Sequence, residues 1–129
     1  MTIIVGYVNT PAGHAALDTG IREAQKSDSD IVVVNASHPR RDSHRLAEAE
    51  VRSVREQLSR AGVKGEVLTP GNELDPAEQI LDTAAEVGAD LIVLGTRKRT
   101  PVGKFLLGST IQKVILDAES PVLCVKAAH

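Results

Sequence analysis

The stretch Leu91-Ile92-Val93-Leu94-Gly95 places four apolar residues in a row directly before a glycine. Consecutive rather than alternating apolar residues are typical of a strand that is buried on both faces of a sheet. Similar apolar runs occur at residues 3–5, 31–34 and 122–125, and a weaker one occurs at 66–69. The sequence therefore predicts five short strands, most of them fully buried.

Amphipathic segments fill the intervals between these runs. Apolar residues recur at helical spacing within residues 11–27, 47–61, 76–87 and 109–118, and the last of these segments turns Ile111, Val114 and Ile115 inward. Thr10-Pro11 and Asp75-Pro76 each pair a capping residue with a proline suited to the first helical position. Gly62 and Gly88 are suited to end the helices before them. Four helices are expected.

The alternation of strands and helices indicates an α/β fold with a parallel open sheet and helices on both faces. We expect a single domain over residues 1–129. Ligands of such sheets bind beyond the carboxyl ends of the strands, where the strand order reverses. The segments expected at that edge are residues 7–11, 36–43 and 95–108.

Composition excludes several classes of protein. The chain has 129 residues, 42% hydrophobic and 25% charged, and no apolar run approaches the roughly 18 residues that a membrane span needs. No signal peptide is recognised, so a cytoplasmic location is expected. A lone Cys124 permits no internal disulfide and no cysteine-built metal site, and the four histidines form no convincing metal site. A net charge of −2, one Phe, one Tyr and no Trp argue against nucleic-acid binding.

Positive charge is concentrated in one acid-free segment, residues 91–116. The five basic residues there are Arg97, Lys98, Arg99, Lys104 and Lys113, while the rest of the chain carries seven more acids than bases. A basic segment inside an acidic protein indicates a local anion site. Charge alone is equally compatible with a solvated basic loop.

Common phosphate-binding motifs are absent, but one phosphate-binding arrangement remains. No G-x-G-x-x-G follows the first strand, and Gly103-Lys104 lacks the hydroxyl residue of a P-loop. Gly108-Ser109-Thr110 opens the last expected helix, whose free N–H groups and positive dipole end favour an anion. Ser109 could cap the helix or bond a phosphate oxygen, and Gly95 would let a ligand approach the backbone. Taken alone, Gly108-Ser109 is better explained by an ordinary helix cap, which any helix can have.

The whole segment resembles the nucleotide motif of the universal stress protein family. That motif reads glycine, two residues, glycine, nine residues, glycine, then serine or threonine. Here Gly95-Thr96-Arg97-Lys98 is followed by nine residues and then Gly108-Ser109. Stretches outside the motif that also resemble the family are Ile3-Ile4-Val5-Gly6, Thr10-Pro11-Ala12, Ala89-Asp90-Leu91-Ile92 and Ser120-Pro121-Val122-Leu123, and within the motif Leu106-Leu107 before Gly108 resembles it as well.

The resemblance implies a five-stranded parallel sheet ordered 3-2-1-4-5, similar to the adenine-nucleotide alpha-hydrolases. It also implies a stress-response protein regulated by a bound adenine nucleotide, with ATP as the cofactor and any Mg²⁺ arriving with the phosphates. No catalytic residue is identified, so at most a very slow ATPase is expected. The nucleotide-binding positions that the resemblance carries over are Gly6, Tyr7, Val8, Ala36, Gly95, Arg97, Lys98, Gly108, Ser109 and Thr110.

Two departures from the family pattern leave an alternative open. Lys98 stands where the motif has its second glycine, and could either obstruct a phosphate or pair with it. Val8 stands where many nucleotide-binding members have an aspartate that contacts the nucleoside. Losing such a hydrogen bond costs roughly 1 kcal/mol. The alternative is a nucleotide-free dimeric interaction module of the same fold, whose protein partner the sequence does not specify.

The last strand is the expected dimer interface. Val122, Leu123, Cys124 and Val125 are all apolar, and the implied strand order puts them at an edge of the sheet. An apolar edge strand offers unpaired N–H and C=O groups to another chain. We expect a homodimer in which two copies of this strand pair antiparallel about a two-fold axis, as the resemblance also implies.

Overall fold

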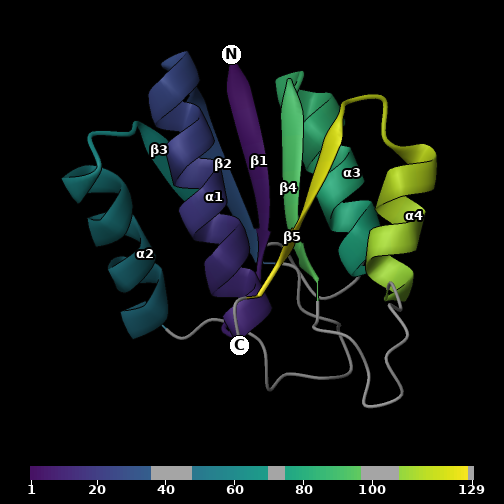
Figure 1. Cartoon of the computed structure of the whole chain (residues 1–129), viewed down its shortest axis with the longest axis horizontal. Coiled ribbons are helices and arrows are strands. Elements are labelled where there is room, and N and C mark those ends of the chain that lie inside the picture. Colours follow the sequence, from purple (N-terminus) through teal and green to yellow (C-terminus); the bar gives the residue numbers. More distant parts are fainter. Residues whose placement is uncertain (36–47, 70–74, 97–107, 128–129) are drawn as a thin grey trace.

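Strands and helices alternate through the described part of the chain (Figure 1). The computed structural model describes residues 1–35, 48–69, 75–96 and 108–127. In chain order the elements are β1 (Thr2–Tyr7), α1 (Pro11–Ser27), β2 (Asp30–Asn35), α2 (Glu48–Arg60), β3 (Gly65–Leu68), α3 (Pro76–Val87), β4 (Leu91–Thr96), α4 (Ser109–Asp117) and β5 (Val122–Lys126).

The five strands form one parallel sheet in the order β3-β2-β1-β4-β5, which confirms the order expected from the resemblance. β1 lies at the centre, where Ile4 is in register with Val32 of β2 and Ile92 of β4. Strand order reverses between β1 and β4, because the chain adds β2 and β3 on one side of β1 and β4 and β5 on the other. The expected switch point is therefore present.

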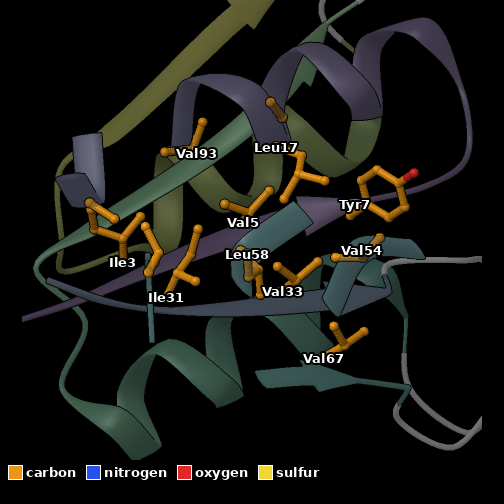
Figure 2. Packing of buried hydrophobic residues seen from close by; sticks show 13 residues of the cluster. Ile3, Val5, Tyr7, Leu17, Ile31, Val33, Val54, Leu58, Val67 and Val93 are labelled. Atoms are coloured by element: carbon orange, nitrogen blue, oxygen red, sulfur yellow. The ribbon is translucent and has the colours of Figure 1, made fainter. Parts of the chain in front are cut away.

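Side chains alternate between two cores, one on each face of the sheet. On one face, Val5 and Val33 pack with residues of α1 and α2, as Figure 2 shows for Leu17, Val54 and the neighbouring side chains. On the other face, a second cluster is built from strand residues together with α3 and α4. It contains Ile4, Val32, Ile80, Ala84, Ile92, Leu94, Ile111 and Val114. The expectation of helices on both faces is confirmed.

The expected helix boundaries are largely confirmed. The Thr10 side chain accepts a hydrogen bond of 3.1 Å from the Gly13 N–H, and the Asp75 side chain accepts one of 3.1 Å from the Ala77 N–H. Both side chains thereby satisfy a free N–H group at the start of a helix. Gly88 ends α3 with φ of 63°, a left-handed conformation that glycine adopts without steric cost.

One inward-facing residue of the last helix was wrongly predicted. Ile111 and Val114 are buried as expected, but the Ile115 side chain is 42% exposed. α4 has nine residues and is packed mainly against α3 and β5, at one side of the sheet. Only a narrow stripe of the helix, which contains Ile111 and Val114, therefore faces the core. Ile115 lies beside that stripe, next to the exposed Leu116.

Candidate functional site

The carboxyl ends of the strands meet at one edge of the sheet, which is the lower edge in Figure 1. β1 ends there at Tyr7, β4 ends at Thr96, and α4 begins there. Since β1 and β4 are neighbours at the switch point, this edge is where a ligand of a parallel open sheet is expected. Of the predicted site residues, Ala36, Arg97 and Lys98 lie outside the described residues.

α4 begins with an open N-terminus. Gly108 is the N-cap residue, and no side-chain capping hydrogen bond is found there among the described residues. Ser109 is instead the first helical residue, so its suggested capping role is wrong. The first hydrogen bond of the helix runs from the Gln112 N–H to the Gly108 carbonyl, at 3.1 Å. The N–H groups of the first turn thus have no acceptor within the helix and are available to an anion.

Space around Gly108 is open on the side where a side chain would project. A Cβ atom built on Gly108 meets no atom of the described structure within 4 Å. Its φ of −66° and ψ of 160° are ordinary extended backbone. A glycine here therefore serves neither packing nor backbone conformation within the described structure, which is consistent with the predicted approach of a phosphate to bare backbone.

Gly95 has a different reason to be glycine. A Cβ atom built on it would overlap the carbonyl group of Ala12 in the first turn of α1. The absent side chain of Gly95 therefore allows α1 to pack directly on β4, rather than leaving room for a ligand. Gly13 allows a similar close approach within the turn after β1, since a Cβ there would overlap the Val8 carbonyl. Whether the backbone of Gly95 also lines a ligand remains a prediction.

Gly6 and Tyr7 are likewise turned into the core. A Cβ on Gly6 would lie 2.7 Å from Leu94 Cδ2 and 2.9 Å from Ile80 Cδ1, so glycine makes room for side chains of the α3 face. The Tyr7 side chain points to the opposite face and is completely buried (Figure 2). The Tyr7 carbonyl accepts a hydrogen bond from Asn35 Nδ2 at 3.2 Å. The side-chain positions of Gly6 and Tyr7 therefore both face the core and not the carboxyl edge of the sheet.

The Tyr7 hydroxyl belongs to a polar network that the sequence did not indicate. It donates to Glu50 Oε1 at 3.2 Å and lies 3.3 Å from Nδ1 of His14, whose Nε2 is 2.8 Å from Asn9 Oδ1. Burial, followed by the negative charge of Glu50, raises the pKa of Tyr7. The network joins the end of β1 to the first turns of α1 and α2. Tyr7, His14 and Glu50 come from three separate elements, so no local sequence signal marks this network.

Val8 occupies the turn that follows β1. Its carbonyl accepts a hydrogen bond of 2.8 Å from the Thr10 N–H, which leads the chain into α1. The turn is fixed by backbone contacts, so the side chain at position 8 is not needed to form it. The apolar side chain supplies no acceptor for a ribose hydroxyl, as the sequence indicated.

One of the five basic residues in the acid-free segment is already paired. Lys113 Nζ lies 3.1 Å from Glu78 Oε1, and this ion pair joins α4 to α3. The hydrogen bond with Glu78 raises the pKa of Lys113. Lys113 therefore helps to hold α4 against α3, and the other basic residues of the acid-free segment are Arg97, Lys98, Arg99 and Lys104.

The predicted dimer strand lies at an edge of the sheet, as expected. β5 pairs with β4 on one side, and its Leu123 side chain is 37% exposed. Val122 and Cys124 pack against the core on the α3 and α4 face, whereas Val125 packs against the opposite core. Cys124 is half-buried, and this burial raises the pKa of its thiol.

Two kinds of feature are absent from the residues that the structure describes. No group of three or more His, Cys, Asp or Glu side chains there could hold a metal ion. Within the same residues, every helix is too short or too polar to cross a membrane. The start of α4 offers backbone N–H groups and the hydroxyls of Ser109 and Thr110, which suit an anion.

Comparison with known proteins gives a consistent result. The model of the universal stress protein family matches residues 1–126. A universal stress protein of Mycolicibacterium smegmatis is 39% identical over 126 residues, which cover 96% of this chain and 96% of that protein. A solved structure of a universal stress protein from Archaeoglobus fulgidus has 29% identity and a TM-score of 0.69, and the match covers 97% of each chain.

A further solved structure shows a ligand. The universal stress protein from Archaeoglobus fulgidus in complex with dAMP is 25% identical to this chain, with a TM-score of 0.61. The match covers 97% of this chain and 96% of the other. The family model, the relative and the solved structures thus each match nearly the whole chain. The chain therefore belongs to the universal stress protein family.

Proposed function

We propose that this protein binds an adenine nucleotide, ATP in particular, at the carboxyl edge of its sheet. The nucleotide lies across the switch point between β1 and β4, with its phosphates at the start of α4. The protein acts by binding rather than by catalysis, and occupancy of the site regulates a stress response in the cytoplasm.

The open N-terminus of α4 is the observation that carries this proposal. Its first-turn N–H groups lack acceptors within the helix, and Gly108 leaves space in front of them within the described structure. A phosphate placed there gains backbone hydrogen bonds and the favourable end of the helix dipole. Four further basic residues belong to the adjoining segment of the sequence. A family member in complex with dAMP supports an adenine nucleotide as the ligand.

The donor groups suit phosphates better than a metal ion. Backbone N–H groups and the hydroxyls of Ser109 and Thr110 can surround phosphate oxygens. Within the described part of the chain no carboxylate cluster could hold Mg²⁺ by itself. Any Mg²⁺ would therefore bind together with the nucleotide, mainly through phosphate oxygens and water.

Calorimetry with ATP, ADP and AMP at low salt tests the proposal directly. We expect binding of modest affinity, because Val8 offers no acceptor to the nucleoside. Val8→Asp should restore that acceptor and strengthen binding severalfold, since one added hydrogen bond contributes roughly 1 kcal/mol. Val8→Asn is a matched control that supplies an acceptor without charge. Absence of both heat and a thermal shift at millimolar nucleotide would contradict nucleotide binding.

The exposed edge strand β5 favours a second candidate, a nucleotide-free dimeric module. Its Leu123 side chain is partly exposed, and its outer backbone edge has no neighbouring strand in the described sheet. Such an edge pairs readily with a second copy. Light scattering should give twice the mass of the chain, and replacing Leu123 and Val125 with lysine should yield monomer or precipitate. A stable monomer of the unmodified protein at micromolar concentration would contradict the dimer.

A further inference from the structure

A groove lies at the amino edge of the sheet, opposite the proposed nucleotide site. Its volume is about 530 Å³, and it is lined by α3, by the starts of β4 and β5 and by the segment that joins α4 to β5. The helices α3 and α4 both end at this edge, which is the upper edge in Figure 1. The larger apolar residues in its lining are Leu81, Ile92 and Pro121. A groove of this size can hold a ligand or part of a peptide.

The lining of the groove is acidic. Its charged residues are Asp90, Asp117 and Glu119, and none of the described lining residues is basic. No ion pair joins any of these three carboxylates to a described residue. Lys113 lies one turn before Asp117, but its ion pair is with Glu78. Asp90 is held in place by one hydrogen bond of 2.9 Å, which its Oδ2 atom accepts from the Thr2 N–H.

The ends of two helices add to this negative charge. The C-terminal end of a helix carries a partial negative charge, which a basic residue in the last turn compensates. α1 and α2 have such residues, Lys26 and Arg60, whereas α3 and α4 have none. α4 instead ends at an acid, Asp117, which is unfavourable for the helix. A cation bound in the groove would compensate both helix ends at once.

Exposed apolar side chains stand next to the groove in the chain. Val87 precedes Gly88 at the end of α3 and is 38% exposed. Ile115 and Leu116 precede Asp117 at the end of α4, and Leu116 is 81% exposed. Exposed apolar side chains around a polar groove are typical of a surface that binds another protein. The occupant should therefore carry apolar groups as well as positive charge.

We propose that the groove at the ends of α3 and α4 is a docking site for a basic segment of a partner protein. The alkyl part of one lysine or arginine side chain lies along the apolar lining, and its cationic group meets the carboxylates of Asp90, Asp117 and Glu119. Adjacent apolar residues of the segment pack against Val87 and Leu116. Lysine and arginine suit such a groove because each joins a long apolar stem to a charged end. The docking site lies at the edge of the sheet opposite the proposed nucleotide site and does not depend on it.

A synthetic peptide provides a direct probe. The peptide is a capped hexapeptide with two leucines and two arginines among glycine and serine, and its control has glutamate in place of arginine. In NMR spectra of the ¹⁵N-labelled protein, the amide signals of Gly88, Ala89 and Ala118 should shift with the arginine peptide and not with the glutamate peptide. High salt should weaken the binding severalfold, because the carboxylates are exposed.

Neutral variants of the acidic residues should change binding and stability in opposite directions. The double variant Asp117→Asn, Glu119→Gln should bind the arginine peptide roughly fivefold more weakly, since two exposed charge pairs are lost. Its melting temperature should stay the same or rise, because a carboxylate near a helix C-terminus is unfavourable. The matched control is Glu56→Gln, Glu66→Gln, which removes two charges from α2 and β3 at the other side of the sheet. It should bind the peptide as the unmodified protein does.

Four results would overturn the proposal. The first is the absence of amide shifts around the groove at millimolar arginine peptide. The second is an equal loss of peptide affinity in both double variants, which would show attraction to net charge alone. The third is displacement of the peptide by spermidine at equal affinity, which would make a small polycation the occupant. The fourth is a dimer of the unmodified protein that Asp117→Asn, Glu119→Gln converts to monomer in light scattering, which would make a second copy the occupant.

Discussion

Gly95 and Gly108 are the first and last glycines of the same motif, yet their surroundings differ completely. A Cβ at Gly95 would overlap the backbone of Ala12, whereas a Cβ at Gly108 would meet no atom of the described residues within 4 Å. Gly95 permits the close approach of α1 to the sheet. Gly108 leaves open space in front of the first N–H groups of α4. One glycine is therefore required by the fold, and the other is available to a ligand.

The same division applies to the other residues that the family resemblance assigned to the ligand. Gly6 and Tyr7 resemble Gly95 in serving the fold. Core side chains occupy the space beside Gly6, and the Tyr7 side chain is buried in the core. Ser109 and Thr110 resemble Gly108 in being available to a ligand, because they belong to the uncapped first turn of α4. The two ends of the motif thus meet different physical requirements, packing at Gly95 and ligand access at Gly108. Substitutions at the two ends should therefore have different effects, on stability and on binding respectively.

Gly95→Ala should produce the largest effect, and it should act on stability. A methyl group cannot fit against the Ala12 backbone, so α1 and β4 would have to move apart. We expect the free energy of unfolding to fall by at least about 3 kcal/mol. Urea denaturation measures this change, and Gly108→Ala is the matched control, expected to have little effect. A loss below about 1 kcal/mol for Gly95→Ala would remove the distinction between the two glycines.

Gly108→Val should act mainly on binding and only modestly on stability. The extended backbone of Gly108 suits a β-branched residue and the described surroundings offer no clash, so the free energy of unfolding should fall only by about 1 kcal/mol, the usual cost of an apolar residue at an N-cap. The added side chain would fill the space in which phosphate meets the backbone. Calorimetry should therefore show that ATP binding is abolished. Undiminished affinity in a folded Gly108→Val protein would place the phosphates elsewhere.

Lys98 offers a smaller test, since it departs from the motif between these two glycines. It lies outside the described residues, so its role remains a prediction. If Lys98 pairs with phosphate, as we expect, Lys98→Ala should weaken ATP binding severalfold more than adenosine binding, and high salt should reduce the difference. If Lys98 obstructs the site, Lys98→Gly should improve ATP binding instead. The opposite signs make calorimetry at two salt concentrations decisive.

Substitution of Tyr7 should have the smallest effect on ligand affinity, because its side chain is buried in the core. Since burial raises its pKa, the folded state holds the Tyr7 proton more tightly than the unfolded state. This contribution to stability is complete below the unfolded pKa of about 10 and is lost as pH rises above it. Tyr7 is the one tyrosine of the chain and there is no tryptophan, so its ultraviolet absorbance reports its titration alone. Tyr7→Phe should abolish the alkaline signal and leave ATP affinity unchanged; a changed affinity would return Tyr7 to the site.

The sequence by itself determined the elements of the fold, because their signals are local. Consecutive apolar residues mark the strands, and the pairs Thr10-Pro11 and Asp75-Pro76 mark two helix starts within one residue. The strand order came from resemblance to the family rather than from local pattern. Motif spacing located the edge of the sheet at which Gly108 and Ser109 lie.

Only the tertiary structure decided which motif residues serve the fold and which remain open to a ligand. The contact of Gly95 with Ala12, and that of Gly6 with Ile80, join residues more than seventy positions apart in the sequence. The polar network around Tyr7 and the groove at the ends of α3 and α4 likewise depend on which elements the fold brings together. A residue's type and its neighbours in the chain do not specify these contacts, because close approach and burial arise from packing between separate elements.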